Sequence, residues 1–147
     1  MILVRVQRED LDPAAELVRL EALGGGALAA FTGLVRGGGG LTGLELEHYP
    51  GMTERTMRAT AEEAMARWPL LGVVAIHRVG HLAPGERIVL AASASAHRHA
   101  ALEATAFLID FLKVRATFWK REHFADGSAR WVEPRCTDDA AAARWSP

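Results

Sequence analysis

The chain has 147 residues, half of them hydrophobic, which suits one domain that buries about two thirds of the surface exposed by the unfolded chain. Its formal net charge of −1 excludes a global electrostatic attraction to nucleic acid or to an anionic membrane, so an anion site must be built locally. One cysteine excludes an internal disulfide, and the first apolar run is too short for a signal peptide or membrane span, so we expect a cytoplasmic single domain over residues 1–147.

The first forty residues predict two strands and one helix. Residues 2–7 alternate well enough for a short strand. A helix is expected over residues 13–23, since proline at its first position and three glycines after its end are typical boundary signals. Residues 27–36 have a strand pattern that ends in the glycine run 37–40, so Arg36 lies at a strand end. We interpret this glycine run as a mobile loop, because it lacks the spacing of a phosphate-binding loop.

The middle of the chain predicts a strand, a helix and two further strands. Residues 44–49 alternate, which predicts a strand with one solvated face that pairs back on the preceding strand. The next helix begins at Thr53 as its N-cap and ends before Pro69. Strands over residues 73–79 and 87–95 follow, joined by a Pro-Gly turn. This order of strands and helices indicates the α+β class.

The longest predicted helix begins after Ser95, an N-cap candidate, and runs to about Val114. His97 and Arg98 occupy its first turn. Because a helix N-terminus has a partial positive charge, cationic side chains there are unfavourable unless they help to hold an anion. They therefore indicate an anion site; the alternative is that Arg98 is solvated or paired with a carboxylate.

The spacing of the histidines argues against a metal site. His97 and His99 fall on different faces of the predicted helix, and a predicted turn separates His77 from His81. We therefore expect no metal ligands.

Lys113 and Lys120 are the only lysines in the chain, against fifteen arginines. Where arginine supplies nearly every positive charge, two lysines indicate a need for an amine, which can lose its proton or form a covalent bond. The alternative is that the two lysines persist by chance in a chain biased toward arginine.

The C-terminal part predicts a β-hairpin followed by a short helix. Strands over residues 118–124 and 130–133 flank an Asp-Gly pair, which is typical of hairpin turns. Alternation along the first strand puts Lys120 and Glu122 on the same face, so this lysine has a carboxylate neighbour. An alanine-rich helix or tail is expected over residues 138–145.

Several motifs, taken together, resemble one family, the catalytic (large) subunit of molybdopterin synthase. The most specific are His-Tyr-Pro-Gly-Met at 48–52 and Phe-Trp-Lys-Arg-Glu at 118–122. The other matching motifs lie in family order at residues 31–36, 67–69, 76–80, 96–98, 112–116 and 130–133. The sequence departs from the family pattern in two places: the loop after Arg36 is shorter and less polar than usual, and Thr117 stands where proline is usual.

The resemblance implies an α+β fold of the α/β-hammerhead type with a C-terminal β-hairpin. It also implies a homodimer within a heterotetramer that contains two copies of a small ubiquitin-like sulfur-carrier subunit, whose C-terminal Gly-Gly thiocarboxylate enters the pocket. The family transfers sulfur from this carrier to cyclic pyranopterin monophosphate, forming the dithiolene of molybdopterin in molybdenum cofactor biosynthesis. No metal or organic cofactor, nucleic acid or membrane is implied.

The resemblance also implies roles for residues at matching positions. Lys113 and Lys120 are implied to be the catalytic lysines. The implied substrate-binding residues are Arg36, His97, Arg98, Arg121, Glu122 and Arg135, the last reaching in from the partner subunit. The chemistry of these residues agrees, because a planar guanidinium suits a phosphate, whereas a lysine amine can stabilise charge and give or take a proton.

Two other functions use the same residues differently. A non-catalytic module could bind a phosphorylated metabolite at the start of the long helix, with the lysines as counter-ions. Such a binder would tolerate Lys→Arg substitution, whereas an enzyme that uses the amine would not. An RNA-binding subunit could use residues 118–121 for stacking and phosphate contacts, but no wider basic surface supports this function.

Overall fold

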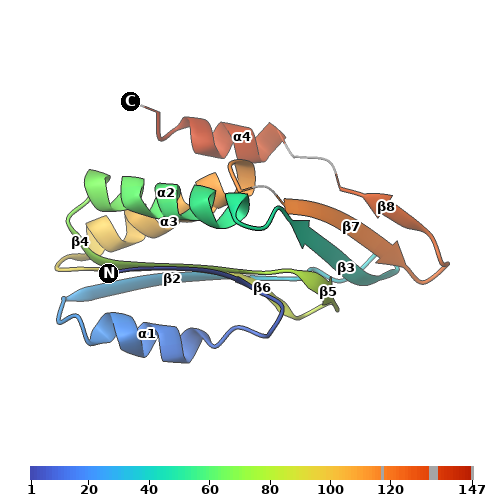
Figure 1. Cartoon of the computed structure of the whole chain (residues 1–147), viewed down its shortest axis with the longest axis horizontal. Helices are drawn as coiled ribbons and strands as arrows, with labels where there is room; N and C mark the ends of the chain where they lie inside the picture. The colour runs from blue at the N-terminus through green and yellow to red at the C-terminus, as the bar shows by residue number, and fades with distance from the viewer. Residues whose placement is uncertain (117, 133–135, 147) are drawn as a thin grey trace.

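Two four-stranded sheets form the framework of the computed structural model, which describes residues 1–116, 118–132 and 136–146 (Figure 1). The strands are β1 (Ile2–Gln7), β2 (Ala27–Leu34), β3 (Leu41–His48), β4 (Leu70–Arg78), β5 (Gly80–Leu82), β6 (Arg87–Ser95), β7 (Phe118–Phe124) and β8 (Ala129–Trp131). The first sheet has the order β1-β4-β6-β2, with β1 parallel to β4 and the other neighbours antiparallel. The second sheet, β5-β3-β7-β8, is antiparallel throughout and extends from one end of the first (Figure 1).

Helices cover both faces of the first sheet. The helices α2 (Met52–Arg67) and α3 (Arg98–Val114) lie on one face, and α1 (Pro13–Glu21) lies on the other (Figure 1). The last helix, α4 (Cys136–Ala143), packs against α3. Within the described residues, no helix is long and apolar enough to cross a membrane.

The first sheet is buried on both faces because β4 and β6 carry apolar residues at nearly every position. On β4, Val73 and Ala75 enter the core shared with α2 and α3, whereas Val74 and Ile76 enter the core shared with α1. Phe107 of α3 is fully buried in the first core, where its ring meets Phe111 edge-on at a centroid distance of 4.6 Å. This packing makes the sheet and α3 a rigid base for the residues at their ends.

A run of glycines carries the chain from the first sheet to the second. Gly38, Gly39 and Gly40 all have positive φ angles, a backbone conformation that residues other than glycine rarely adopt. The Gly40 carbonyl accepts a hydrogen bond from Ala125 N–H at 2.9 Å, so the loop is tied to the hairpin between β7 and β8. Arg36, as predicted, lies just beyond a strand end, between β2 and these glycines.

Three local expectations were wrong, and one strand was missed. Thr53 is not the N-cap of α2, because Gly51 is the N-cap and Thr53 is the second residue of the helix. The strand β3 does not pair back on β2; its partners are β5 and β7, while β2 pairs with β6. The short strand β5 was not predicted. Ser95 does not cap α3, because it is the last residue of β6 and its hydroxyl donates to the Pro69 carbonyl at 2.9 Å; His97 is the N-cap. The strand predicted over residues 87–95 and the hairpin turn are confirmed.

Candidate active site

The two lysines come from different elements and face the same space. Lys113 lies in the last turn of α3, and Lys120 lies on β7, opposite Leu46 of β3. Both line a narrow cavity of about 50 Å³ between α3 and the two sheets, together with His77 and Phe118. Two lysines that are seven residues apart in the sequence, one in α3 and one on β7, therefore line the same cavity.

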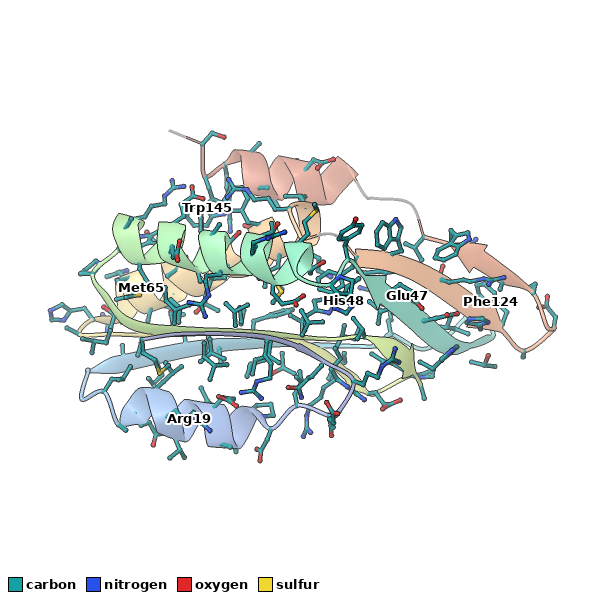
Figure 2. All side chains as sticks on the ribbon, in the orientation of Figure 1. Arg19, Glu47, His48, Met65, Phe124 and Trp145 are labelled. Carbon is teal, nitrogen blue, oxygen red and sulfur yellow. The ribbon has the colours of Figure 1, made fainter. Side chains whose placement is uncertain are left out.

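The narrow cavity adjoins a wider cleft of about 430 Å³, which the two lysines also line. Arg36 and the glycine loop line this cleft, as do residues of β3, β7 and β8. Phe124, labelled in Figure 2, is a lining residue on the part of the second sheet farther from α2 and α3. The cleft thus runs along the inner face of the second sheet.

The cleft concentrates positive charge. Among the described residues that line it, Arg36, Lys113, Lys120 and Arg130 are basic and Glu122 is the one acid. Glu122 is already engaged, because its carboxylate accepts a hydrogen bond from Arg130 Nε at 3.2 Å. A protein of net charge −1 therefore presents a local cationic surface, as an anionic substrate requires.

His77 is buried and lines the lysine cavity, a role that the sequence patterns did not indicate. Its ring stacks on Phe118 at a centroid distance of 3.8 Å and an interplanar angle of 19°. Nδ1 donates to the Arg78 carbonyl at 2.8 Å, because that oxygen can only accept, so Nε2 carries the lone pair. The sequence feature that could have indicated this role is the position of His77 within the largely apolar strand β4.

The charge state of His77 follows from its surroundings. Burial lowers the pKa of His77 to about 3, the hydrogen bond to the Arg78 carbonyl opposes this shift, and the charges of Lys120 and Lys113 add to it. His77 is therefore neutral at physiological pH and presents an acceptor, not a third positive charge, beside the lysines.

The other predicted residues do not all meet in this cleft. Arg36 and Glu122 line it, but Arg121 lies on the opposite face of β7, where its guanidinium is 5.6 Å from the Trp131 ring centroid. His97 and Arg98 line a separate open pocket of about 420 Å³ at the start of α3. Arg135 lies outside the described residues.

The length of α3 separates the two groups of predicted residues. Arg98 begins the helix and Lys113 lies in its last turn, so a rise of 1.5 Å per residue places them about 22 Å apart along the axis. Within one chain, His97 and Arg98 therefore cannot touch a small molecule that is held by the lysines.

The sequence matches the family described as MoaE protein over residues 6–115, about three quarters of the chain. The chain belongs to the MoaE family. A MoaE relative from Mesorhizobium japonicum, named molybdopterin synthase catalytic subunit, is 54% identical over 146 residues, covering 97% of this chain and 92% of the relative. The protein of the same name from Pseudomonas aeruginosa is 52% identical and covers 97% of each chain.

Solved MoaE structures agree with the fold. The molybdopterin biosynthesis MoaE protein from Burkholderia ambifaria superposes with a TM-score of 0.85 at 47% identity, covering 99% of this chain and 98% of that one. Molybdopterin synthase from Staphylococcus aureus gives a TM-score of 0.78 at 28% identity, covering 87% of this chain and 95% of that chain. These likenesses confirm both the family indicated by the motifs and the α+β fold.

Proposed function

We propose that this MoaE-family protein is the catalytic subunit of a molybdopterin synthase and that the lysine cleft is its sulfur-transfer site. The observation that carries this proposal is the convergence of Lys113, Lys120 and Arg36 on one cleft, although they come from three separate segments. The names of relatives about half identical to this chain support the reaction. Sulfur would pass from the C-terminal thiocarboxylate of a small carrier protein to cyclic pyranopterin monophosphate.

The cationic cleft suits two anionic reactants. The carrier tail and the phosphate of the pterin repel each other in water, and the basic residues of the cleft offset this repulsion. Arg36 suits the phosphate, since a guanidinium can donate two parallel hydrogen bonds. The narrow cavity beyond the cleft, with the lysines at its wall, would receive the reacting atoms.

Each transfer involves a bond-forming and a bond-breaking event. The thiocarboxylate sulfur attacks a substrate carbon, a C–S bond forms, and the C–O bond on that carbon breaks. A lysine ammonium can donate the proton that the departing oxygen requires. The sulfur is then joined to both the substrate and the carrier's acyl carbon, so a water molecule or a lysine amine must take the acyl group to free the carrier.

His77 would orient the lysine ammonium that donates this proton. A neutral histidine with its lone pair on Nε2 can accept a hydrogen bond from an ammonium, whereas a charged one would repel it. Because the stack on Phe118 fixes the ring, the acceptor keeps one position beside the lysines. His77 is therefore proposed as a positioning residue.

The distance between the two groups of residues supports a site that is shared by two chains. If His97 and Arg98 bind the same substrate as the lysines, they must come from the second chain of a homodimer, because α3 holds them about 22 Å from Lys113 in their own chain. The proposed carrier would then dock at each of two equivalent clefts. A cytoplasmic location stays a prediction from the sequence.

Mixed dimers test both the reaction and the shared site. Lys120→Ala and Arg98→Ala homodimers should each lose most activity in single-turnover conversion of the pterin by thiocarboxylated carrier, when the precursor is kept near its dissociation constant for wild type so that weakened binding lowers turnover. When the two variants are unfolded together and refolded, half of the dimers are mixed and each has one intact site, so activity should return to about a quarter of wild type. A His99→Ala variant, altered on an exposed neighbour of Arg98, is the matched control and should stay active.

The outcomes separate the parts of the proposal. No recovery, when native mass spectrometry shows that mixed dimers have formed, would place Arg98 and Lys120 in one chain's site or in unrelated roles. Full activity of Lys120→Ala would refute the lysine cleft as the reaction site. A strict monomer at micromolar concentration would remove the homodimer.

A further inference from the structure

Three side chains with metal-binding atoms meet on the outer face of the second sheet, away from the lysine cleft. His123 Nε2 donates to Glu45 Oε1 at 3.0 Å, and His81 Nε2 lies 3.9 Å from Glu45 Oε2. One candidate ligand atom from each residue lies within 4.8 Å of the other two. The three residues belong to β5, β3 and β7, which are adjacent strands.

The strand register holds these residues on one face. Glu45 is directly opposite His81 on β5, and His123 is opposite Gly43, two residues before Glu45. Their sequence neighbours Leu44, Leu82 and Glu122 point to the inner side of the sheet, where they are buried or line the cleft. The cluster is thus set by backbone pairing of three strands and not by long loops.

The donor set fits a first-row divalent transition metal. Two imidazole nitrogens and one carboxylate oxygen are ligands that Zn²⁺ prefers, and a water molecule can fill the fourth position. In a tetrahedral zinc site the ligand atoms are roughly 3.3 Å apart, close to the 3.0 Å and 3.9 Å found here. The His81 side chain is 75% exposed, so it can rotate toward the ion without a change in the backbone.

The charges around the cluster are compatible with a cation. Glu45 contributes a carboxylate, the one negative charge among the three side chains. Arg121 is a cationic residue that lies directly opposite Glu45 in the register of β3 and β7. Its guanidinium lies near the Trp131 ring on β8, which is the side of β7 away from His81.

We propose that Glu45, His81 and His123 form a binding site for a first-row divalent transition-metal ion, with Zn²⁺ as the occupant. The ion would join β5, β3 and β7 through side chains and would stiffen the sheet whose other face carries Lys120. The site is independent of the proposed sulfur transfer, because none of its three residues lines the lysine cleft.

Calorimetric titration of metal-free protein with Zn²⁺ tests the site. The protein should carry no affinity tag and should contain Cys136→Ser, so that neither a tag nor the thiol accounts for binding. We expect one equivalent of Zn²⁺ to bind, and His81→Ala and His123→Ala each to weaken binding by about tenfold or more. His99→Ala, which removes an exposed histidine outside the cluster, should bind as the parent does.

Two further measurements make the result decisive. Zn²⁺ should raise the melting temperature of the parent but not of His81→Ala, since a ligand stabilises only the state that binds it. Co²⁺ should give visible absorption bands in the parent that His123→Ala loses, and excess Mg²⁺ should not displace it. The proposal is overturned if Zn²⁺ does not bind, or if folded His81→Ala and His123→Ala bind it as tightly as the parent.

Discussion

The His77 ring lies almost parallel to the Phe118 ring, with centroids 3.8 Å apart and planes inclined by 19°. This stack joins the end of β4 in the first sheet to the start of β7 in the second. Phe118 is two residues before Lys120, and both point to the same side of β7. The stack therefore fixes the strand that carries Lys120 against the rigid base formed by the first sheet and α3.

The buried His77 should make stability depend on pH. Its folded-state pKa, about 3, is below the ordinary value of 6.5, so the unfolded chain takes up the proton first as the pH falls. The folding stability is thus fully present above about pH 6.5 and is lost progressively toward pH 3. Between pH 7 and pH 5 the loss from this one group should be about 2 kcal/mol.

Urea unfolding at pH 7 and pH 5 measures this loss. His77→Phe keeps a ring against Phe118 but cannot titrate, so its stability should fall by about 2 kcal/mol less than that of wild type over this range. His81→Gln is the control, because the His81 side chain is exposed. Equal pH dependence of wild type and His77→Phe would contradict a neutral, buried His77.

Arg78 should be essential for the fold near the cleft. Its guanidinium is buried, donates to the Arg8 carbonyl at 2.8 Å and 3.1 Å, and pairs with Glu86 at 3.2 Å. Glu86 in turn accepts from Val35 N–H through its carbonyl at 2.8 Å, next to Arg36. Arg78→Met should lower the free energy of unfolding by about 3 kcal/mol, since it leaves buried polar partners unsatisfied.

Thermal or urea unfolding tests this prediction, with Arg58→Met on the exposed side of α2 as the matched control. A loss below about 1 kcal/mol in Arg78→Met, typical of surface positions, would show that the buried contacts of Arg78 contribute little.

Arg98→Ala should weaken binding of the phosphorylated pterin without unfolding the protein. The side chain is exposed at the first residue of α3, and the loss of one charge-assisted hydrogen bond is worth about 1.5–3 kcal/mol. Calorimetric titration with the precursor measures the change, and circular dichroism checks the fold. Unchanged affinity in the folded variant would mean that Arg98 is simply solvated.

Local signals predicted the elements better than their partners. The alternation of apolar and polar residues predicted the strand β3. The local sequence does not show that the three glycines with positive φ place this strand in the second sheet, where it pairs with β7 and β5. Alternation along β7 did place Lys120 and Glu122 on one face, because this property needs no partner.

The candidate site was likewise predicted only in part from the sequence. Residue types indicated the lysines and Arg36, whereas the neutral state of His77 comes from burial by segments distant in the sequence. The sequence motifs also could not show that a helix of seventeen residues separates Arg98 from Lys113. Only the length of α3 requires two chains if both groups contact one substrate.

Lys120→Arg should keep the fold and carrier binding but lose most sulfur transfer, by about 100-fold or more if the amine donates or accepts a proton. Arginine keeps the positive charge but cannot deprotonate. Lys113→Arg should also be impaired but should retain more activity, because Lys113 is exposed at the helix end whereas Lys120 is half-buried on β7.

Single-turnover conversion of the precursor by thiocarboxylated carrier measures this loss, and binding of carrier and precursor is measured alongside so that lost affinity is not mistaken for lost chemistry. Turnover of Lys120→Arg within about threefold of wild type, a change worth well under 1 kcal/mol in the barrier, would mean that charge alone is enough. The cleft would then act as a binding site for two anions, and the proton would have to come from another group or from water.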